Sequence, residues 1–241
     1  MLKNVTITGV DDKTNLVDLM DLSIKYPFVE WGVLVSKASL TEGSENERYP
    51  DVSIFNKLTK CKRIMKNLNF SLHVCGSYLK DIVCDGIWNL DKDTNNNLST
   101  FSRIQLNASQ ILSKVNLPVF SESLKNINQE VILQIKSFDG NEELVETCRK
   151  NAKISILYDT SGGRGLKPNS WPNSVINCGY AGGLNPENVT DSLLEISKVV
   201  SHEPIWIDAE TGLRTDDYLD LKKVEEFLSE SSWFVKNCSE R

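Results

Sequence analysis

Eight short runs rich in β-branched and other apolar residues recur along the chain, and apolar residues at helical spacing separate most of them. One helical stripe, Leu16, Leu19 and Met20, follows the first run, and another, from Leu193 to Val199, follows the seventh. Regular alternation of strands and helices is typical of parallel β/α folds. Eight repeats in 241 residues suit a closed barrel. We therefore predict an α/β fold, a single-domain (β/α)8 TIM barrel of eight parallel strands over residues 1–241. A doubly wound open sheet is the alternative. The predicted strands are Val5–Gly9, Val29–Val35, Phe70–Cys75, Ile104–Asn107, Val131–Lys136, Ile154–Asp159, Ile176–Ala181 and Ile205–Ala209.

The intervals between these strands are not all regular. Residues Gly162 to Ser174 contain glycine and proline and lack a helical stripe, so we predict that the sixth helix is missing or short. The very polar stretch Asp91 to Asn97 predicts a surface loop. Short helices are expected at Ile111 to Val115 and at Leu144 to Cys148.

Composition narrows the classes of partner. Hydrophobic residues make up 40% of the chain and charged residues 25%, which is ordinary for a soluble globular protein with a sizeable core. The net charge of −6 and the absence of a strong basic cluster disfavour a nucleic acid or an anionic membrane as partner. No apolar run is long enough to span a bilayer. Six scattered cysteines without a C-x-x-C pair favour reduced thiols and a cytoplasmic location. We predict no metal ion and no cofactor, and the oligomeric state stays open.

Polar residues alternate with apolar ones in the second halves of most strands. Residues that face the helices must be apolar, so this alternation turns the polar side chains toward the inside of the barrel. Active sites of such barrels lie at the carboxyl ends of the strands. Because unpartnered buried polar groups are costly, a converging ring of them predicts a polar ligand there. The residues expected inside are Thr6, Thr8, His73, Cys75, Gln105, Asn107, Gln134, Lys136, Asp159, Trp206, Asp208 and Glu210.

The turn after the seventh strand contains Gly182 and Gly183, which allow a close approach to the backbone. Asn185 is a suitable N-cap and Pro186 suits the first position of the helix that follows. Open amides at such a turn form an anion site of phosphate size. The alternative is a tight turn whose small residues serve packing alone.

Six segments, in order along the chain, resemble the phosphoribosylanthranilate isomerase family, a (β/α)8 barrel of tryptophan biosynthesis. Ala181–Val189, A-G-G-L-N-P-E-N-V, is similar to the family's S-G-G-L-N-P-E-N-V almost letter for letter. Ile104–Asn107 resembles V-Q-L-H, and Ile207–Leu213 resembles V-D-V-S-S-G-V. In the other three segments, Val5–Val10 resembles the family's V-K-I-C-G-I. Gly32–Val35, followed by Arg48-Tyr49, resembles the family's second strand and the arginine loop after it. Leu157–Gly165 resembles the family's L-L-D-T and the glycine-containing loop that follows.

The resemblance implies an Amadori-type isomerisation of a phosphorylated ribosylamine, with Asp159 as general acid and Arg48 on the substrate carboxylate. The family's basic cysteine is Thr8 here, and a threonine hydroxyl is not a base near neutral pH. Asn107 and Glu210 stand where the family has a histidine and a phosphate-side serine. These departures favour a different reaction or a different ligand on the same scaffold.

Two functions from different classes are therefore compared. The first is an isomerase or lyase acting by acid–base chemistry on a small phosphorylated, sugar- or nucleotide-like metabolite, with Asp159, Lys136 and His73 as candidate proton carriers. The second is a non-catalytic protein that binds or sequesters such a molecule. A third arrangement would hold Mg²⁺ between Asp159, Asp208 and Glu210. The predicted ligand-binding residues are Thr8, Arg48, Gln105, Asn107, Arg164, Gly182, Gly183, Asp208, Glu210 and Gly212, the two arginines clamping an anionic group.

Overall fold

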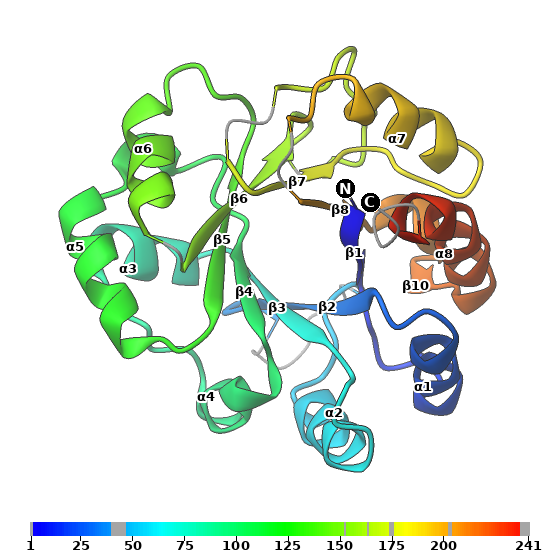
Figure 1. Ribbon diagram of the computed structural model, residues 1–241. Coiled ribbons are helices and arrows are strands. Elements are labelled where there is room, and N and C mark those ends of the chain that lie inside the picture. Colours follow the sequence, from blue (N-terminus) through cyan, green and yellow to red (C-terminus); the bar gives the residue numbers. More distant parts are fainter. Residues whose placement is uncertain are drawn as a thin grey trace.

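Eight parallel strands close into a barrel, with β1 paired to β2 and so on around to β8, which pairs back to β1 (Figure 1). The computed structural model describes residues 2–39, 47–151, 153–162, 164–173, 176–201 and 204–236. The closed barrel confirms the predicted fold and excludes the open sheet. The strands are β1 Leu2–Thr8, β2 Val29–Ser36, β3 Phe70–Cys75, β4 Arg103–Leu106, β5 Glu130–Ile135, β6 Ile154–Asp159, β7 Cys178–Ala181 and β8 Ile205–Ala209.

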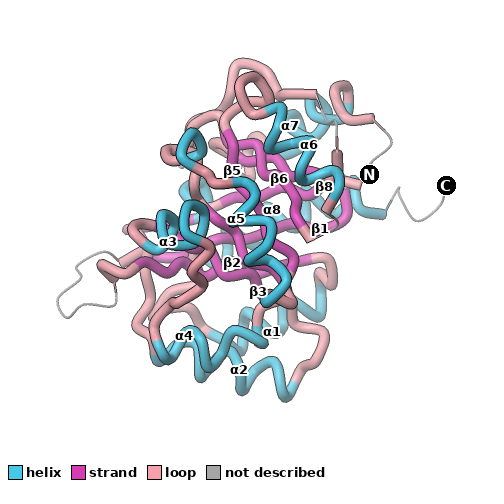
Figure 2. The backbone as a smooth tube through the Cα atoms, turned by 90° about the vertical axis from the view of Figure 1, so that its left-hand side faces the viewer, coloured by secondary structure: helices cyan, strands magenta, loops and turns pink. Residues whose placement is uncertain are grey.

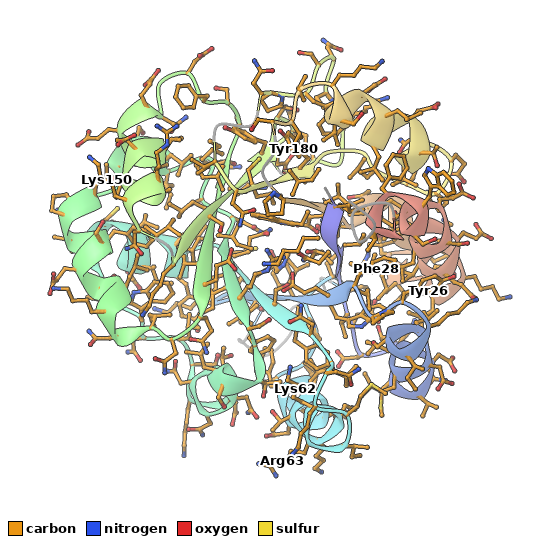
Figure 3. The ribbon with its side chains drawn as sticks, in the orientation of Figure 1. Tyr26, Phe28, Lys62, Arg63, Lys150 and Tyr180 are labelled. Atoms are coloured by element: carbon orange, nitrogen blue, oxygen red, sulfur yellow. The ribbon has the colours of Figure 1, made fainter. Side chains whose placement is uncertain are left out.

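Helices surround the strands, as the side view in Figure 2 shows. Except for α4, each helix buries apolar side chains against the barrel: in α1, for example, Leu19 and Leu22 are buried, and Asn15 caps the helix by accepting a hydrogen bond from the amide of Val17. Beyond α1, Tyr26 packs edge-to-face on Phe28 with ring centroids 5.9 Å apart (Figure 3). The helices are α1 Leu16–Lys25, α2 Ser53–Ile64, α3 Tyr78–Asp85, α4 Lys92–Asn97, α5 Leu117–Ser123, α6 Glu142–Lys150, α7 Val189–Ser197 and α8 Leu221–Lys236.

Shorter elements complete the loops. The predicted helix at 111–115 is only a 3₁₀ turn, Leu112–Lys114, whereas the helix predicted at 144–148 is confirmed as part of α6. Other 3₁₀ turns are Leu98–Thr100, Leu124–Asn126 and Thr211–Leu213, and a small hairpin pairs β9 Arg214–Thr215 with β10 Tyr218–Leu219.

The stretch predicted as a surface loop, 91–97, is instead mostly the helix α4. The Asp91 carboxylate caps it by accepting hydrogen bonds from the amides of Asp93 and Thr94. Asn97 is buried, and its side chain accepts a hydrogen bond of 2.7 Å from Thr59 on α2. The polar residues of this stretch therefore join two helices, which is why their composition misled the prediction.

Between β6 and β7, the described residues contain no helix, as predicted for the sixth interval (Figure 1). Residues 164–173, called the strap below, cross this sector in an irregular path. The strap is fixed by Trp171, whose indole donates to Glu195 of α7 over 3.1 Å and meets the ring of Tyr180 edge-on. Tyr180 points outward from β7 and donates to the carbonyl of Pro172 over 3.0 Å (Figure 3).

The helix α7 begins later than predicted. Asn185 and Pro186 precede it, and the first helical residue is Val189. Asn185 still caps the connecting turn, because its side chain accepts from the amide of Asn188 over 2.9 Å and the Asn188 side chain accepts in return from the amide of Asn185.

The amino-terminal half of the barrel interior is closed by a buried ion pair. Arg103 bonds Glu30 and also donates to Thr6 over 3.1 Å. Burial alone would raise the pKa of Glu30, but Arg103 outweighs it and the pKa is lowered. The guanidinium stacks on Trp206, which has room because position 179 is glycine: a Cβ there would lie 2.2 Å from the indole. Arg103, Glu30 and Trp206 therefore fill this part of the barrel interior.

Two further findings bear on the expectations from composition. No disulfide joins the five cysteines of the described ranges. Among the helices of those ranges, none combines the length and the apolar character needed to cross a membrane. The described residues form one barrel domain.

Candidate functional site

A deep cavity of about 60 Å³ lies at the carboxyl ends of the strands, inside the barrel mouth. Its lining includes every predicted site residue except Lys136, Arg48 and Arg164. One water molecule needs about 10–15 Å³ of such a cavity, so there is room for roughly four to six units of that size. This is about the size of one phosphate group. The lining is Thr8, His73, Gln105, Asn107, Gln134, Leu157, Asp159, Ser161, Gly165, Ala181, Gly182, Gly183, Leu184, Asp208, Ala209, Glu210, Thr211 and Gly212.

A larger hollow of about 470 Å³ adjoins the deep cavity on the β2–β5 side, and we call it the side hollow. The two share Asn107, Gln134 and Glu210, so one ligand can occupy both. The remaining lining of the side hollow is Leu34, Arg48, Tyr49, Cys75, Gly76, Leu79, Ala108, Ser109, Gln110, Ile111 and Gly162. Of these, sequence reasoning named only Arg48 with its neighbour Tyr49, and Cys75 as an inward residue.

Two buried carboxyl groups face each other across the deep cavity. Asp159 ends β6 and Asp208 lies in β8, and both are in register with Ala181 of the intervening strand. Their backbones are therefore separated by two strand spacings, about 10 Å. The short side chain of Ala181 leaves the space between the carboxyl groups open.

Asp159 is 4% exposed and held in one orientation. Its Oδ1 accepts hydrogen bonds from the amide and the hydroxyl of Ser161, at 3.0 and 2.7 Å, and its Oδ2 accepts one from Gln134 at 2.7 Å. Both oxygens of Asp159 are therefore held by donors of the chain itself.

Asp208 is 7% exposed and bonded on both oxygens. Thr8 donates to Oδ1 over 2.6 Å, and Gln105 donates to Oδ2 over 3.2 Å. Burial raises the pKa of Asp208 to about 6, although both hydrogen bonds oppose the rise. A carboxyl group that titrates near neutrality is suited to proton transfer.

His73 lies deeper, 1% exposed, and is not suited to carry a proton near neutral pH. Burial lowers the pKa of His73 to about 4, so the ring is neutral. Its Nε2 lies 3.0 Å from the hydroxyl of Ser71 and its Nδ1 lies 3.1 Å from the amide nitrogen of Gln105. His73 therefore positions Gln105, which in turn holds Asp208.

Lys136 does not lie buried as predicted. It follows the last residue of β5, its side chain is exposed, and its Cε lies beside Gly162 at the rim. Past the end of a strand the alternation of faces no longer applies, and the expectation that Lys136 faces the inside of the barrel was wrong.

The glycines of the β7 and β8 turns lie against the chain's own backbone. A Cβ at Gly183 would lie 2.4 Å from the amide nitrogen of Lys167 in the strap, and one at Gly212 would lie 2.3 Å from the carbonyl oxygen of Leu184. Packing therefore requires glycine at both positions. Over the described ranges, the amides of Gly183 and Gly212 nevertheless have no hydrogen-bond acceptor, and both residues line the deep cavity.

Arg48 is paired with Glu210 at the boundary between the two spaces. Its Nε donates to Oε1 over 2.8 Å, and its Nη2 bonds the same oxygen. Burial raises the pKa of Glu210, and Arg48 opposes that rise; burial would lower the pKa of Arg48, but Glu210 outweighs it. The arginine expected to hold a ligand's carboxylate thus already binds a carboxylate of this chain.

Arg164 does not join the other predicted residues. It is exposed on the strap, and its Nε donates to the carbonyl of Ser161 over 2.9 Å. The glycine-containing loop that follows β6, 161–165, includes residue 163, which lies outside the described residues.

The magnesium arrangement is not supported. In the part of the chain that the structure describes, no three His, Cys, Asp or Glu side chains are placed to hold a metal ion. Asp159, Asp208 and Glu210 are instead each held by donors of the protein itself.

No family model matches the chain, and no curated protein matches it in sequence. The structure is similar to N-(5'-phosphoribosyl)anthranilate isomerase from Pyrococcus furiosus, with a TM-score of 0.52 and 20% identity over 95% of this chain and 98% of that one. It is also similar to KGPDC from Streptococcus mutans, with a TM-score of 0.50 and 9% identity over 97% and 99% of the chains. The YdjI aldolase from Escherichia coli K12 has a TM-score of 0.51 and 10% identity, over 98% and 90%.

These likenesses show a shared fold. The isomerase is one of several barrels to which the chain is similar, so membership of its family stays a prediction. The chain is an eight-stranded parallel TIM barrel.

Proposed function

We propose that this protein binds a small phosphorylated metabolite in the barrel mouth and moves a proton within it, as an isomerase or a lyase. The pair of buried carboxyl groups on either side of Ala181, facing one cavity, carries this proposal. The three similar barrels include, by name, an isomerase of a phosphoribosyl compound and an aldolase.

The phosphate group is assigned to the deep cavity, next to the amides of Gly183 and Gly212. Its size supports the assignment, as do open amides from two separate turns. Backbone amides at such turns bind anions because each N–H carries a partial positive charge. The carboxylate of Glu210 does not oppose a phosphate with its full charge, because Arg48 neutralises it.

Proton transfer requires one group that accepts and one that donates. One carboxylate takes the proton from a carbon beside a carbonyl or imine group, and the other, protonated, gives its proton to the oxygen or nitrogen of that group. The protein's proton count is unchanged overall. Asp208, with its pKa of about 6, is present in both states near neutral pH. Asp159, which lines the same cavity, is its partner.

A non-catalytic binding protein is the second candidate. It is favoured by Thr8, whose hydroxyl donates to Asp208 at the position where the similar family has its basic thiol. Such a protein would keep the cavity and its amides but release its ligand unchanged.

Native mass spectrometry of the protein purified from its own cell lysate tests the proposal. We expect a retained phosphorylated compound, which the wild-type protein converts and an Asp159→Asn variant binds without converting. Asp139→Asn, an exposed carboxylate outside the site, is the matched control and should convert it normally. A bound compound that wild type leaves unchanged would favour the second candidate. A bound compound that inorganic phosphate displaces neither from wild type nor from the variant would contradict both candidates.

A further inference from the structure

The side hollow has two charged side chains in its lining, and they are paired with each other. Arg48 and Glu210 have side chains 36% and 20% exposed, and the guanidinium bonds the carboxylate through both Nε and Nη2. No other Lys, Arg, Asp or Glu belongs to the described lining. Over the described lining, the charges of this pair therefore cancel.

The other titratable groups in the side hollow are uncharged. Burial raises the pKa of the Cys75 thiol to about 11, and burial likewise raises the pKa of Tyr49. The Asn107 amide donates to the Cys75 sulfur over 3.1 Å. The remaining polar lining comes from Ser109, Gln110 and Gln134, next to an apolar wall of Leu34, Leu79, Ala108 and Ile111.

A carboxylate entering this space would meet an arginine that is already bound. It would have to displace Glu210, which then lies unpaired beside a second negative charge, or remain near Glu210 with no cation of its own. Either course is unfavourable, because a partly buried charge without a counter-charge loses hydration that neutral donors replace only in part. A repulsive group placed at a subsite excludes a competitor in this way.

We propose that the side hollow is the subsite for a ring-sized polar group of the ligand that bears no negative charge, and that the Arg48–Glu210 pair excludes ligands bearing a carboxylate there. This inference rests on the proposed function, since the phosphate of the same ligand lies in the adjoining deep cavity. Asn107 and Gln134, which line both spaces, are placed to contact the linking part of the ligand.

Two commercially available mononucleotides test the subsite, because they differ only in a neutral carboxamide or a carboxylate on the ring: nicotinamide mononucleotide and nicotinic acid mononucleotide. We expect wild type to bind the carboxamide more tightly, measured by calorimetry at fixed ionic strength. In Glu210→Gln the arginine is released, and the affinity for the carboxylate should rise about tenfold or more relative to the carboxamide. The double variant Arg48→Gln/Glu210→Gln should lose that gain.

Glu187→Gln, the same chemical change at an exposed position, is the matched control and should keep the wild-type ratio. Wild type binding the carboxylate as tightly as the carboxamide, or a ratio unchanged in Glu210→Gln, would overturn the proposal. If inorganic phosphate binds but neither mononucleotide binds more tightly than phosphate, the subsite proposal is also overturned. The proposed function would not be contradicted by that result. Failure of phosphate as well as both mononucleotides would reject the proposed function and this inference together.

Discussion

Replacing Asp208 by asparagine should change how the stability of the protein depends on pH. Asp208 is buried, and burial raises its pKa to about 6 from an ordinary value of 3.8. The folded protein therefore holds this proton more tightly than the unfolded chain does. Stability is highest when the group is protonated, falls as pH rises from about 4 to 6, and is constant above that range. Asparagine has the same shape and does not titrate.

The size of the effect follows from the shift. About two pKa units at 1.36 kcal/mol each give a total of about 3 kcal/mol. Between pH 4.5 and pH 7 the wild-type protein should lose about 2 kcal/mol of unfolding free energy through this group alone. The variant should not lose it. The unfolding free energy of the variant minus that of wild type should therefore rise by about 2 kcal/mol between pH 4.5 and pH 7.

Urea unfolding followed by tryptophan fluorescence at several pH values measures the difference. Subtracting the unfolding free energy of wild type from that of the variant at each pH cancels the titration of every group that does not interact with Asp208. Asp139→Asn, an exposed residue, provides the control and should give a difference that is flat with pH. A flat difference for Asp208→Asn too, or one that moves against the variant as pH rises, would refute the assignment of a buried, raised-pKa carboxyl group to the site.

Three further changes test the structure around the site. His73→Gln should make the free energy of unfolding less sensitive to acid, because the lowered pKa of His73 removes about 2 kcal/mol of it in wild type between pH 8 and pH 5. Acid-unfolding curves of variant and wild type that superimpose would contradict this. Gly183→Ala should lower the free energy of unfolding by more than Gly140→Ala. Both positions have positive φ, but a Cβ at Gly183 would meet the strap, whereas nothing lies within 4 Å of a Cβ at Gly140. Equal losses measured by chemical denaturation would argue against close packing of the strap. Arg103→Met should cost about 3–5 kcal/mol by leaving Glu30 charged and buried, and a loss below about 1 kcal/mol would show that the ion pair is not buried.

The fold could be predicted because the signal for each strand and helix is local. Two-residue alternation and helical spacing placed eight strands within three residues of their observed starts. The exception, α4, has no apolar stripe. Its residue Asn97 is buried because Thr59 of another helix bonds it, and sequence spacing carries no information on that contact.

Much of the site could be predicted for the same reason. Alternation in β3, β4 and β8 turned His73, Gln105 and Asp208 inward, and all three line the deep cavity. Lys136 was misplaced because it lies one residue beyond the end of β5. The pairing of Arg48 with Glu210 joins residues 162 positions apart, and only the closed barrel brings them together.

The assignment of a phosphate group to the deep cavity is tested most directly by nuclear magnetic resonance. Inorganic phosphate is titrated into ¹⁵N-labelled protein, and the amide resonances are followed. We expect saturable shifts of the Gly183 and Gly212 amide resonances, since these amides have no acceptor in the described structure, whereas the amide resonance of exposed Gly140 should not shift. Saturable shifts confined to other parts of the surface, or no saturable shift at up to ten millimolar phosphate (about −3 kcal/mol of binding free energy), would contradict it.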